Sequence, residues 1–135
     1  MKIFLFLICI ASTIAGCKKG NPEPSGLVGT WELRHYSGTI AGVSKELPKG
    51  NGKLIQFNAD STCKFFTNFK QDNQGTFKIV KSGVTWGDAK YDAIYFGENE
   101  SPSFMVLKAD SLIIGSTFAD GETSLYIKQI RFSNQ

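Results

Sequence analysis

The chain has 135 residues and a formal net charge of +3, from 15 basic and 12 acidic side chains. This length suits one small domain. Because the lysines and arginines are scattered rather than gathered into one stripe, the sequence argues against nucleic-acid binding.

The N-terminus combines one positive charge with a short apolar run. Lys2 precedes the unbroken apolar segment Ile3 to Ile10, and mostly small residues follow it. A membrane-spanning helix needs about 20 apolar residues, whereas only 14 residues separate Lys2 from Cys17. This layout is typical of a secretory signal peptide and favours export over a membrane-spanning anchor.

Ile14, Ala15, Gly16 and Cys17 read IAGC and resemble the bacterial lipobox, although leucine is more usual at the first position. The resemblance implies that residues 1–16 are a lipoprotein signal peptide and that Cys17 becomes a mature N-terminus carrying acyl chains such as palmitate. Two or three chains exceed what stable anchoring requires. The alternative, an ordinary signal peptide with an unmodified thiol, would leave a reactive cysteine in an oxidising compartment.

Residues 17–26 form the expected lipidated N-terminus and linker. Pro22 and Pro24 hold this segment extended, and the ten residues to Leu27 could span up to about 35 Å. Under the enteric sorting rule that the lipobox resemblance invokes, Lys18 after the lipidated cysteine points to the outer membrane. We therefore expect a lipid-anchored protein in the cell envelope of a Gram-negative bacterium, facing either the periplasm or the medium.

Residues 27–135 carry a strand pattern throughout. Alternating aromatic and β-branched residues recur between turn residues, and no long helical period interrupts them. The expected strands cover residues 29–36, 53–58, 62–69, 76–81, 84–87, 91–96, 104–108, 111–116 and 124–132. A turn is expected at KQDNQG, residues 70–75, and a long loop at 37–52. Such a meander closes on itself, which predicts an all-β fold, an up-and-down antiparallel β-barrel of about eight strands.

The three cysteines separate by position. Cys9 lies in the expected signal peptide and Cys17 is the expected lipid site, so only Cys63 remains in the mature domain and no internal disulfide can form. Cys63 alternates with Phe65 on one strand face. A small buried apolar side chain is therefore the favoured role over a nucleophile.

The opening strand resembles that of lipocalins, and the whole plan, with three later motifs, also resembles the lipocalin-like lipoproteins of Gram-negative bacteria. Gly29 and Trp31 match the Gly-x-Trp opening, and the other motifs are F-x-x-D-x-T at 57–62, Gly-x-Phe at 75–77 and L-x-x-D-x-L at 107–112. The resemblance implies that Trp31 covers the barrel's end and that a basic residue of the last strand lies across its ring. Lys128 and Arg131 are the candidates, and we favour Arg131 because its planar head stacks better.

Catalytic and metal-binding motifs are weak in this chain. His35 is the only histidine, which excludes a multi-histidine metal site. The acidic pairs Asp88 with Asp92 and Glu98 with Glu100 lie among turn residues, where solvated loops explain them better than acid–base catalysis. We expect no enzymatic activity, no metal and no cofactor.

Aromatic side chains are spread over most of the expected strands. An eight-stranded barrel can be filled by such side chains or can hold one small ligand, and their number favours a mostly filled interior with a shallow mouth. Binding of a small apolar or amphipathic ligand in that mouth is the leading hypothesis, with these candidate residues: Phe57, Phe65, Phe77, Tyr95 and Phe104. The alternative is a filled barrel whose loops, above all 37–52, dock a protein or glycan; the sequence names no protein partner.

Overall fold

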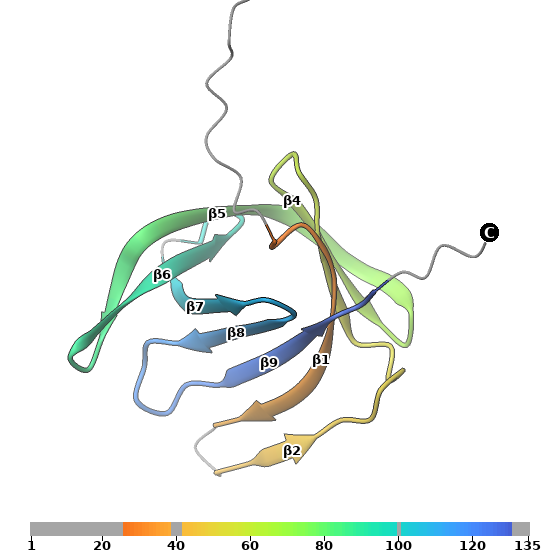
Figure 1. Ribbon diagram of the computed structural model, residues 1–135, viewed down its shortest axis with the longest axis horizontal. Coiled ribbons are helices and arrows are strands. Elements are labelled where there is room, and N and C mark those ends of the chain that lie inside the picture. The colour runs from red at the N-terminus through yellow and green to blue at the C-terminus, as the bar shows by residue number, and fades with distance from the viewer. Residues whose placement is uncertain (1–25, 39–41, 100, 131–135) are drawn as a thin grey trace, which may run out of the picture.

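The computed structural model describes residues 26–38, 42–99 and 101–130 (Figure 1). Within these residues the chain forms strands and turns and no helix, so none of the described segments is a helix that could cross a membrane. The strands are β1 (Gly29–Ser37), β2 (Ser44–Glu46), β3 (Leu54–Phe57), β4 (Thr62–Thr67), β5 (Lys70–Trp86), β6 (Ala89–Phe96), β7 (Ser103–Lys108), β8 (Ser111–Ser116) and β9 (Thr123–Lys128).

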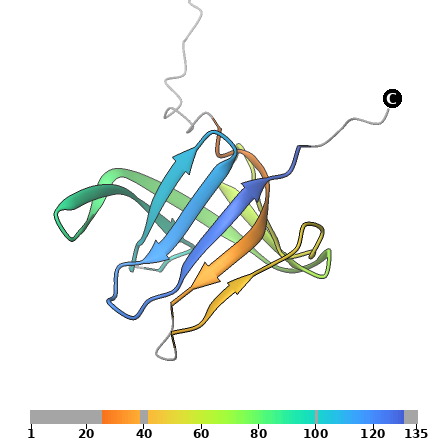
Figure 2. The ribbon, with the colours of Figure 1, turned by 60° about the horizontal axis from the view of Figure 1, so that its bottom comes forward.

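Eight of the strands close into an antiparallel barrel. Each strand pairs with its neighbour in the order β1-β3-β4-β5-β6-β7-β8-β9, and β1 then pairs with β9 to close the ring. The short strand β2 lies outside the barrel and pairs only with β1 (Figures 1 and 2). The expected all-β class and the up-and-down barrel of eight strands are confirmed.

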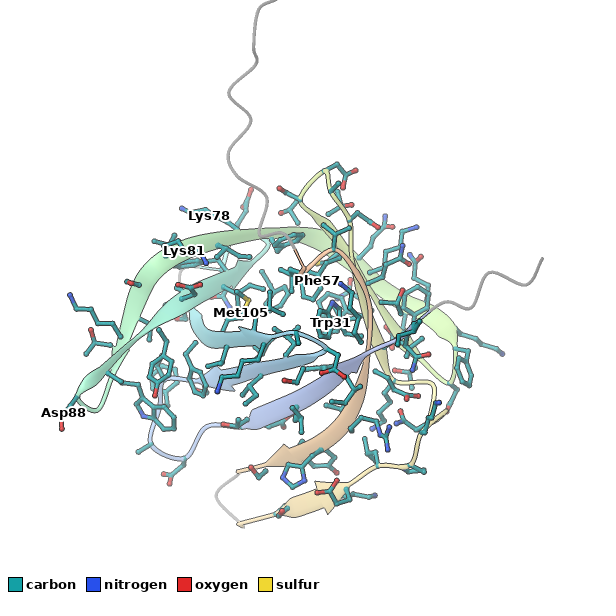
Figure 3. The ribbon with its side chains drawn as sticks, viewed as in Figure 1. Trp31, Phe57, Lys78, Lys81, Asp88 and Met105 are labelled. Atoms are coloured by element: carbon teal, nitrogen blue, oxygen red, sulfur yellow. The ribbon has the colours of Figure 1, made fainter. Side chains whose placement is uncertain are left out.

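One face of the sheet carries the main apolar core. Every barrel strand contributes at least one side chain to this core, which places it in the interior. We call it the inner cluster, and it consists of Leu27, Trp31, Ile55, Phe57, Cys63, Phe65, Phe77, Ile79, Ile94, Phe96, Met105, Leu107, Leu112, Ile114 and Tyr126. Figure 3 shows Trp31, Phe57 and Met105 inside the ring of strands. Because each buried apolar side chain contributes about 1.5 to 3 kcal/mol, this cluster is the main source of stability.

A second apolar cluster lies on the opposite face of β5 to β8. Ala93 and Phe104 are the direct neighbours of the inward Ile94 and Met105, so strand alternation points them out of the barrel. We call this group the outer cluster, and it consists of Val80, Val84, Tyr91, Ala93, Tyr95, Phe104, Val106 and Ile113. The barrel therefore has an apolar interior and one apolar outer wall.

The long strand β5 differs from the sequence expectation in two ways. It runs without a break through KQDNQG, so the turn predicted at residues 70–75 is wrong. The chain instead reverses at Asn68 and Phe69, which both adopt positive φ values of 51° and 62°, as the two central residues of a tight hairpin do. The two segments predicted at 76–81 and 84–87 are halves of the same strand, joined across a register shift between Val80 and Val84.

The segment predicted to be a long loop contains fixed structure. Residues 44–46 form β2, and the turn that follows is held by Glu32, whose side chain is 1% exposed. The Oε1 atom of Glu32 accepts hydrogen bonds from the backbone N–H groups of Gly50 at 2.7 Å and Asn51 at 3.0 Å. The side-chain amide of Asn51 also donates to the carbonyl of Leu33 at 2.8 Å. A buried carboxylate needs such partners, so this turn is anchored to β1.

Candidate functional site

Trp31 closes one end of the barrel. Its ring is completely buried, and its indole N–H donates to the carbonyl of Leu27 at 2.7 Å. The ammonium of Lys128 lies 5.2 Å from the centre of the Trp31 ring and donates to the carbonyl of Gly26 at 2.6 Å. A cation in this position over an indole contributes about 1 kcal/mol. Arg131, which the sequence favoured for this place, lies outside the described residues.

Gly29 makes the contact between Lys128 and Trp31 sterically possible. Its φ of 137° lies in a region that L side chains rarely adopt, and an added Cβ would lie 3.0 Å from Cε of Lys128. Any larger residue would therefore strain the backbone and crowd the lysine. Gly29, Trp31 and Lys128 together form a structural closure of the barrel's end.

Three of the five candidate ligand residues lie together in the interior. The Phe57 and Phe77 rings meet edge to face, with 5.0 Å between their centroids. In the same cluster, the ring centroids of Phe65 and Phe96 are 5.7 Å apart. Phe57 and Phe77 are 1% and 7% exposed. These two rings pack against each other, as interior rings of a filled barrel do.

The other two candidates, Tyr95 and Phe104, lie in the outer cluster, so the structure does not bring the five residues together. Phe104 stacks against Trp86, with 4.8 Å between ring centroids and 18° between ring planes. The ring centroid of Tyr91 lies 5.5 Å from that of Phe104. Phe104 covers Gly115 directly across the β7–β8 pair, where an added Cβ would overlap its ring. Alternation alone could not distinguish this face from the interior, because both faces of β6 and β7 are apolar.

A pocket of about 310 Å³ opens at the end of the barrel where β3 begins and β4 ends. Since β1 and β3 are antiparallel, this end lies opposite the start of β1, where Trp31 closes the barrel. The residues that line the pocket are Leu33, Lys53, Leu54, Ile55, Phe65, Phe66, Thr67, Asp72 and Tyr126. Of the ligand residues expected from the sequence, only Phe65 lies in this pocket.

The pocket combines an apolar floor with a polar rim. Ile55, Phe65 and Tyr126 belong to the inner cluster, and Leu33 faces Tyr126 across the β1–β9 seam. At the rim, the hydroxyl of Thr67 donates to the carboxylate of Asp72 at 2.5 Å.

Lys53 also lines this pocket and has no side-chain partner among the described residues. Burial raises the pKa of Tyr126 above its usual value, so its phenol stays neutral at physiological pH. The pocket can therefore hold an apolar group beside a neutral hydroxyl, with a cation at its edge. The sequence missed Leu33, Lys53 and Tyr126, and their clustering depends on strand register, which no local motif reports.

Cys63 and His35 show no catalytic arrangement. Cys63 is 1% exposed in the inner cluster, and burial raises the pKa of its thiol, which disfavours the reactive thiolate. A surface pocket of about 280 Å³ borders Cys63, but the thiol is not open to it. The Nδ1 atom of His35 lies 2.7 Å from Oε1 of Glu46 on β2 and has no hydrogen-bond partner among the described residues.

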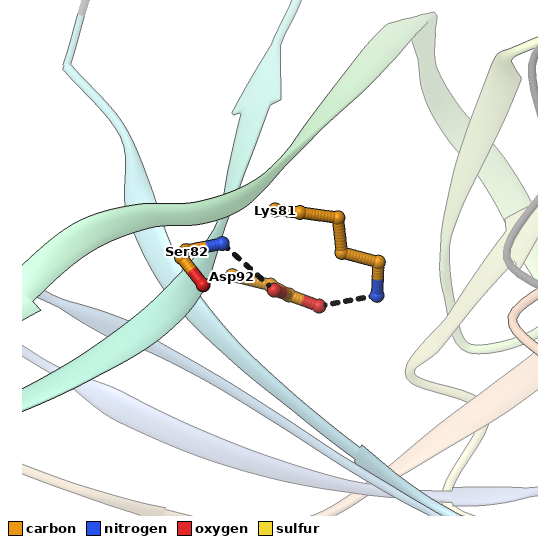
Figure 4. A network of polar contacts seen from close by, with 3 residues as sticks. All are labelled: Lys81, Ser82 and Asp92. Atoms are coloured by element: carbon orange, nitrogen blue, oxygen red, sulfur yellow. Dashed lines mark hydrogen bonds and ion pairs between the residues drawn. The ribbon is translucent and has the colours of Figure 1, made fainter.

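Asp92, one of the acidic residues considered for catalysis, is engaged on β5 rather than with Asp88. Its carboxylate accepts hydrogen bonds from Nζ of Lys81 at 2.7 Å and from the backbone N–H of Ser82 at 3.0 Å (Figure 4). Desolvation alone would raise the pKa of Asp92, but these two hydrogen bonds and the Lys81 charge outweigh it and lower the pKa. The described residues hold no cluster of three or more metal-ligating side chains.

Comparisons of the chain with protein-family models, with curated proteins and with solved structures found no significant match. The functional interpretation therefore depends on the geometry of this chain.

Proposed function

We propose that this protein is a non-enzymatic, lipid-anchored, lipocalin-like barrel that binds a small amphipathic ligand in the pocket at its open end. The observation that carries the proposal is the pocket itself, in which Leu33, Ile55 and Tyr126 line an apolar floor beneath Lys53. Its volume of about 310 Å³ lies at the lower end of the range for ligand pockets, about 300 to 1,000 Å³. A ligand with a short apolar body and an anionic or polar head matches this arrangement.

The filled interior supports a small ligand over a large one. The Phe57 and Phe77 rings occupy the interior, so a ligand would contact only the open end. The turn at residues 47–53 is fixed by Glu32, which supports ligand binding over docking of a partner through that segment.

The anchor in this proposal is Cys17, acylated after removal of residues 1–16 in the envelope of a Gram-negative bacterium, at the outer membrane. The support comes from the lipobox-like IAGC and from the apolar run before it. The linker would then carry the barrel close to the bilayer without burying it.

Titration with a small fluorescent aromatic sulfonate, which has a short apolar body and an anionic head, tests the ligand pocket, using the full chain. Leu33→Trp should fill the pocket floor and weaken probe binding at least tenfold. Leu125→Trp is the matched control, because Leu125 lies next to the inward Tyr126 on β9 and points away from the pocket. Equal binding by the two variants, or no binding by the unmodified protein, would contradict the pocket proposal.

Labelling of cells with radioactive palmitate tests the anchor separately. The unmodified chain should incorporate label and fractionate with membranes, whereas Cys17→Ser should lose the label. A labelled Cys17→Ser protein, or an unlabelled native chain, would count against lipidation whatever the pocket binds.

A further inference from the structure

The outer cluster leaves amphipathic aromatic side chains at the surface of the barrel. Phe104 and Ala93 form its buried base, at 4% and 0% exposure, while Trp86 covers Phe104 and remains 43% exposed. Tyr91 and Tyr95 lie half-buried at its margins. A surface of this kind is apolar at its centre and carries indole and phenol groups at its edge, as side chains at a membrane–water interface do.

The charged strand residues on this face are lysines, while the acidic Asp88 lies at the tip of the β5–β6 hairpin (Figure 3). Strand register places two charged residues on the outer face of β5 to β9, Lys78 opposite Tyr95 and Lys108 opposite Ser111. The ammonium of Lys78 lies 5.4 Å from the centre of the Tyr95 ring, directly beside the aromatic surface. Figure 3 shows Lys78 on the outside of the barrel near β5. Asp92 pairs with the inward Met105 and so does not belong to this face, and its carboxylate is engaged by Lys81.

We propose that the face of the barrel formed by the outer cluster and Trp86 lies against an anionic lipid bilayer. The aromatic side chains enter the headgroup region while Lys78 and Lys108 contact anionic headgroups. The proximity of the bilayer rests on the proposed anchor at Cys17, because at most about 35 Å of chain separates that residue from Leu27. Exposed apolar surface marks contact sites, and on this face Trp86 is the large apolar side chain that stays exposed.

Fluorescence quenching by bromine-labelled lipid tests this contact. The lipidated full-length protein is reconstituted into vesicles of phosphatidylethanolamine and phosphatidylglycerol, with bromine on the acyl chains. Trp31 is completely buried and Trp86 is 43% exposed, so Trp86 is the expected source of quenchable emission, and Trp86→Phe should remove most of it. We expect at least half of the Trp86 emission to be quenched.

Two lysine variants that change the net charge equally distinguish contact of this face with the bilayer from attachment through the anchor alone. Lys78→Glu should reduce the quenching of Trp86 at least twofold, whereas Lys45→Glu, on the exposed strand β2 outside the barrel, should leave it unchanged.

Four results would overturn the proposal. Equal loss in both lysine variants would show that only net charge matters, and unquenched Trp86 on vesicle-bound protein would show tethering without docking. Trp86 that is shielded without vesicles, in proportion to protein concentration, would show that a second copy covers this face. Protein that does not sediment with the vesicles overturns the anchor as well, so the two proposals fail distinguishably.

Discussion

The inner and outer clusters use the same strands but differ in how they are enclosed. The inner cluster draws side chains from all eight barrel strands and is surrounded by the sheet. The outer cluster comes from β5 to β8 only and is covered by its own members and by Trp86. An abundance of aromatic residues in a barrel sequence therefore does not measure the size of an internal cavity, because a large share of them can lie on the outside.

Because the two clusters are enclosed differently, truncating a side chain should destabilise the protein to different extents in each. A void in the inner cluster is bounded on every side by paired backbone, which cannot collapse into it. A void in the outer cluster is bounded on one side by mobile side chains and solvent. Equal chemical changes should therefore cost more inside than outside.

The largest expected effect compares Phe57→Ala with Phe104→Ala. These residues are 1% and 4% exposed, so burial alone does not separate them. We expect Phe57→Ala to lower the free energy of unfolding by about 4 kcal/mol and Phe104→Ala by about 2 kcal/mol, since Trp86 can settle into the outer void. Urea unfolding of the full chain measures both. An equal or larger loss for Phe104→Ala would mean that the outer wall is as rigid as the interior.

An intermediate effect compares two strand glycines, Gly115 in β8 and Gly75 in β5. An added Cβ at Gly115 would overlap the Phe104 ring, whereas at Gly75 nothing lies within 4 Å of the added carbon. Gly115→Ala should therefore cost about 2 kcal/mol through overpacking, and Gly75→Ala should gain about 0.5 kcal/mol because strand glycine is entropically unfavourable. The tryptophan emission spectrum of Gly115→Ala should also shift as Phe104 loses its stack with Trp86. A neutral Gly115→Ala would show that Phe104 moves away freely.

The smallest expected effect concerns Asp92 and Lys81. The pKa of Asp92 is lower in the folded protein than in the unfolded chain, so its stabilisation is present above the unfolded value and is lost as the pH falls through the folded value. The side chain of Lys81 is 76% exposed, so solvent screening limits the contribution to about 0.5 kcal/mol. The unfolding free energy at pH 6 and pH 3 measures it, and Lys81→Gln should narrow the difference. If the difference in unfolding free energy between pH 6 and pH 3 is unchanged in Lys81→Gln, Lys81 does not cause the stabilisation.

Sequence reasoning predicted the barrel because its evidence is local. Alternation and turn residues identified most strands, and the Gly-x-Trp pattern drew attention to Gly29 and Trp31 at what is a closed barrel end in the structure. The sequence does not indicate the reversal at Asn68 and Phe69, because phenylalanine is not a typical turn residue and rarely adopts the positive φ of 62° that it has here. The sequence pattern instead predicts a turn in the glutamine- and asparagine-containing residues 70–75 that follow.

The pocket and the outer cluster could not be predicted from local sequence patterns, because both depend on how distant strands pair. Leu33, Lys53 and Tyr126 come from three separate parts of the chain, and only the β1–β9 closure and the β3 register bring them together. Tyr95 and Phe104 lie on strands that the sequence predicts, but alternation does not show whether their side chains point into or out of the barrel. A strand with two apolar faces has the same pattern in either orientation. The burial of Glu32 could not be predicted either, since nothing in the sequence shows that a turn 18 residues later donates hydrogen bonds to its carboxylate.

The meeting of Gly26 with Lys128 has a consequence for how the chain could be rearranged. The two ends of the described barrel lie side by side, with the backbone N–H of Gln129 donating to the carbonyl of Thr30 at 2.8 Å. Neighbouring ends of this kind tolerate circular permutation, in which a short linker joins them and a surface turn is cut to make new termini. The β7–β8 turn at Ala109 and Asp110 is one such place. A permuted chain would keep every strand pair while its termini left the barrel at that turn, so the place of the termini and the fold are separable properties of this molecule.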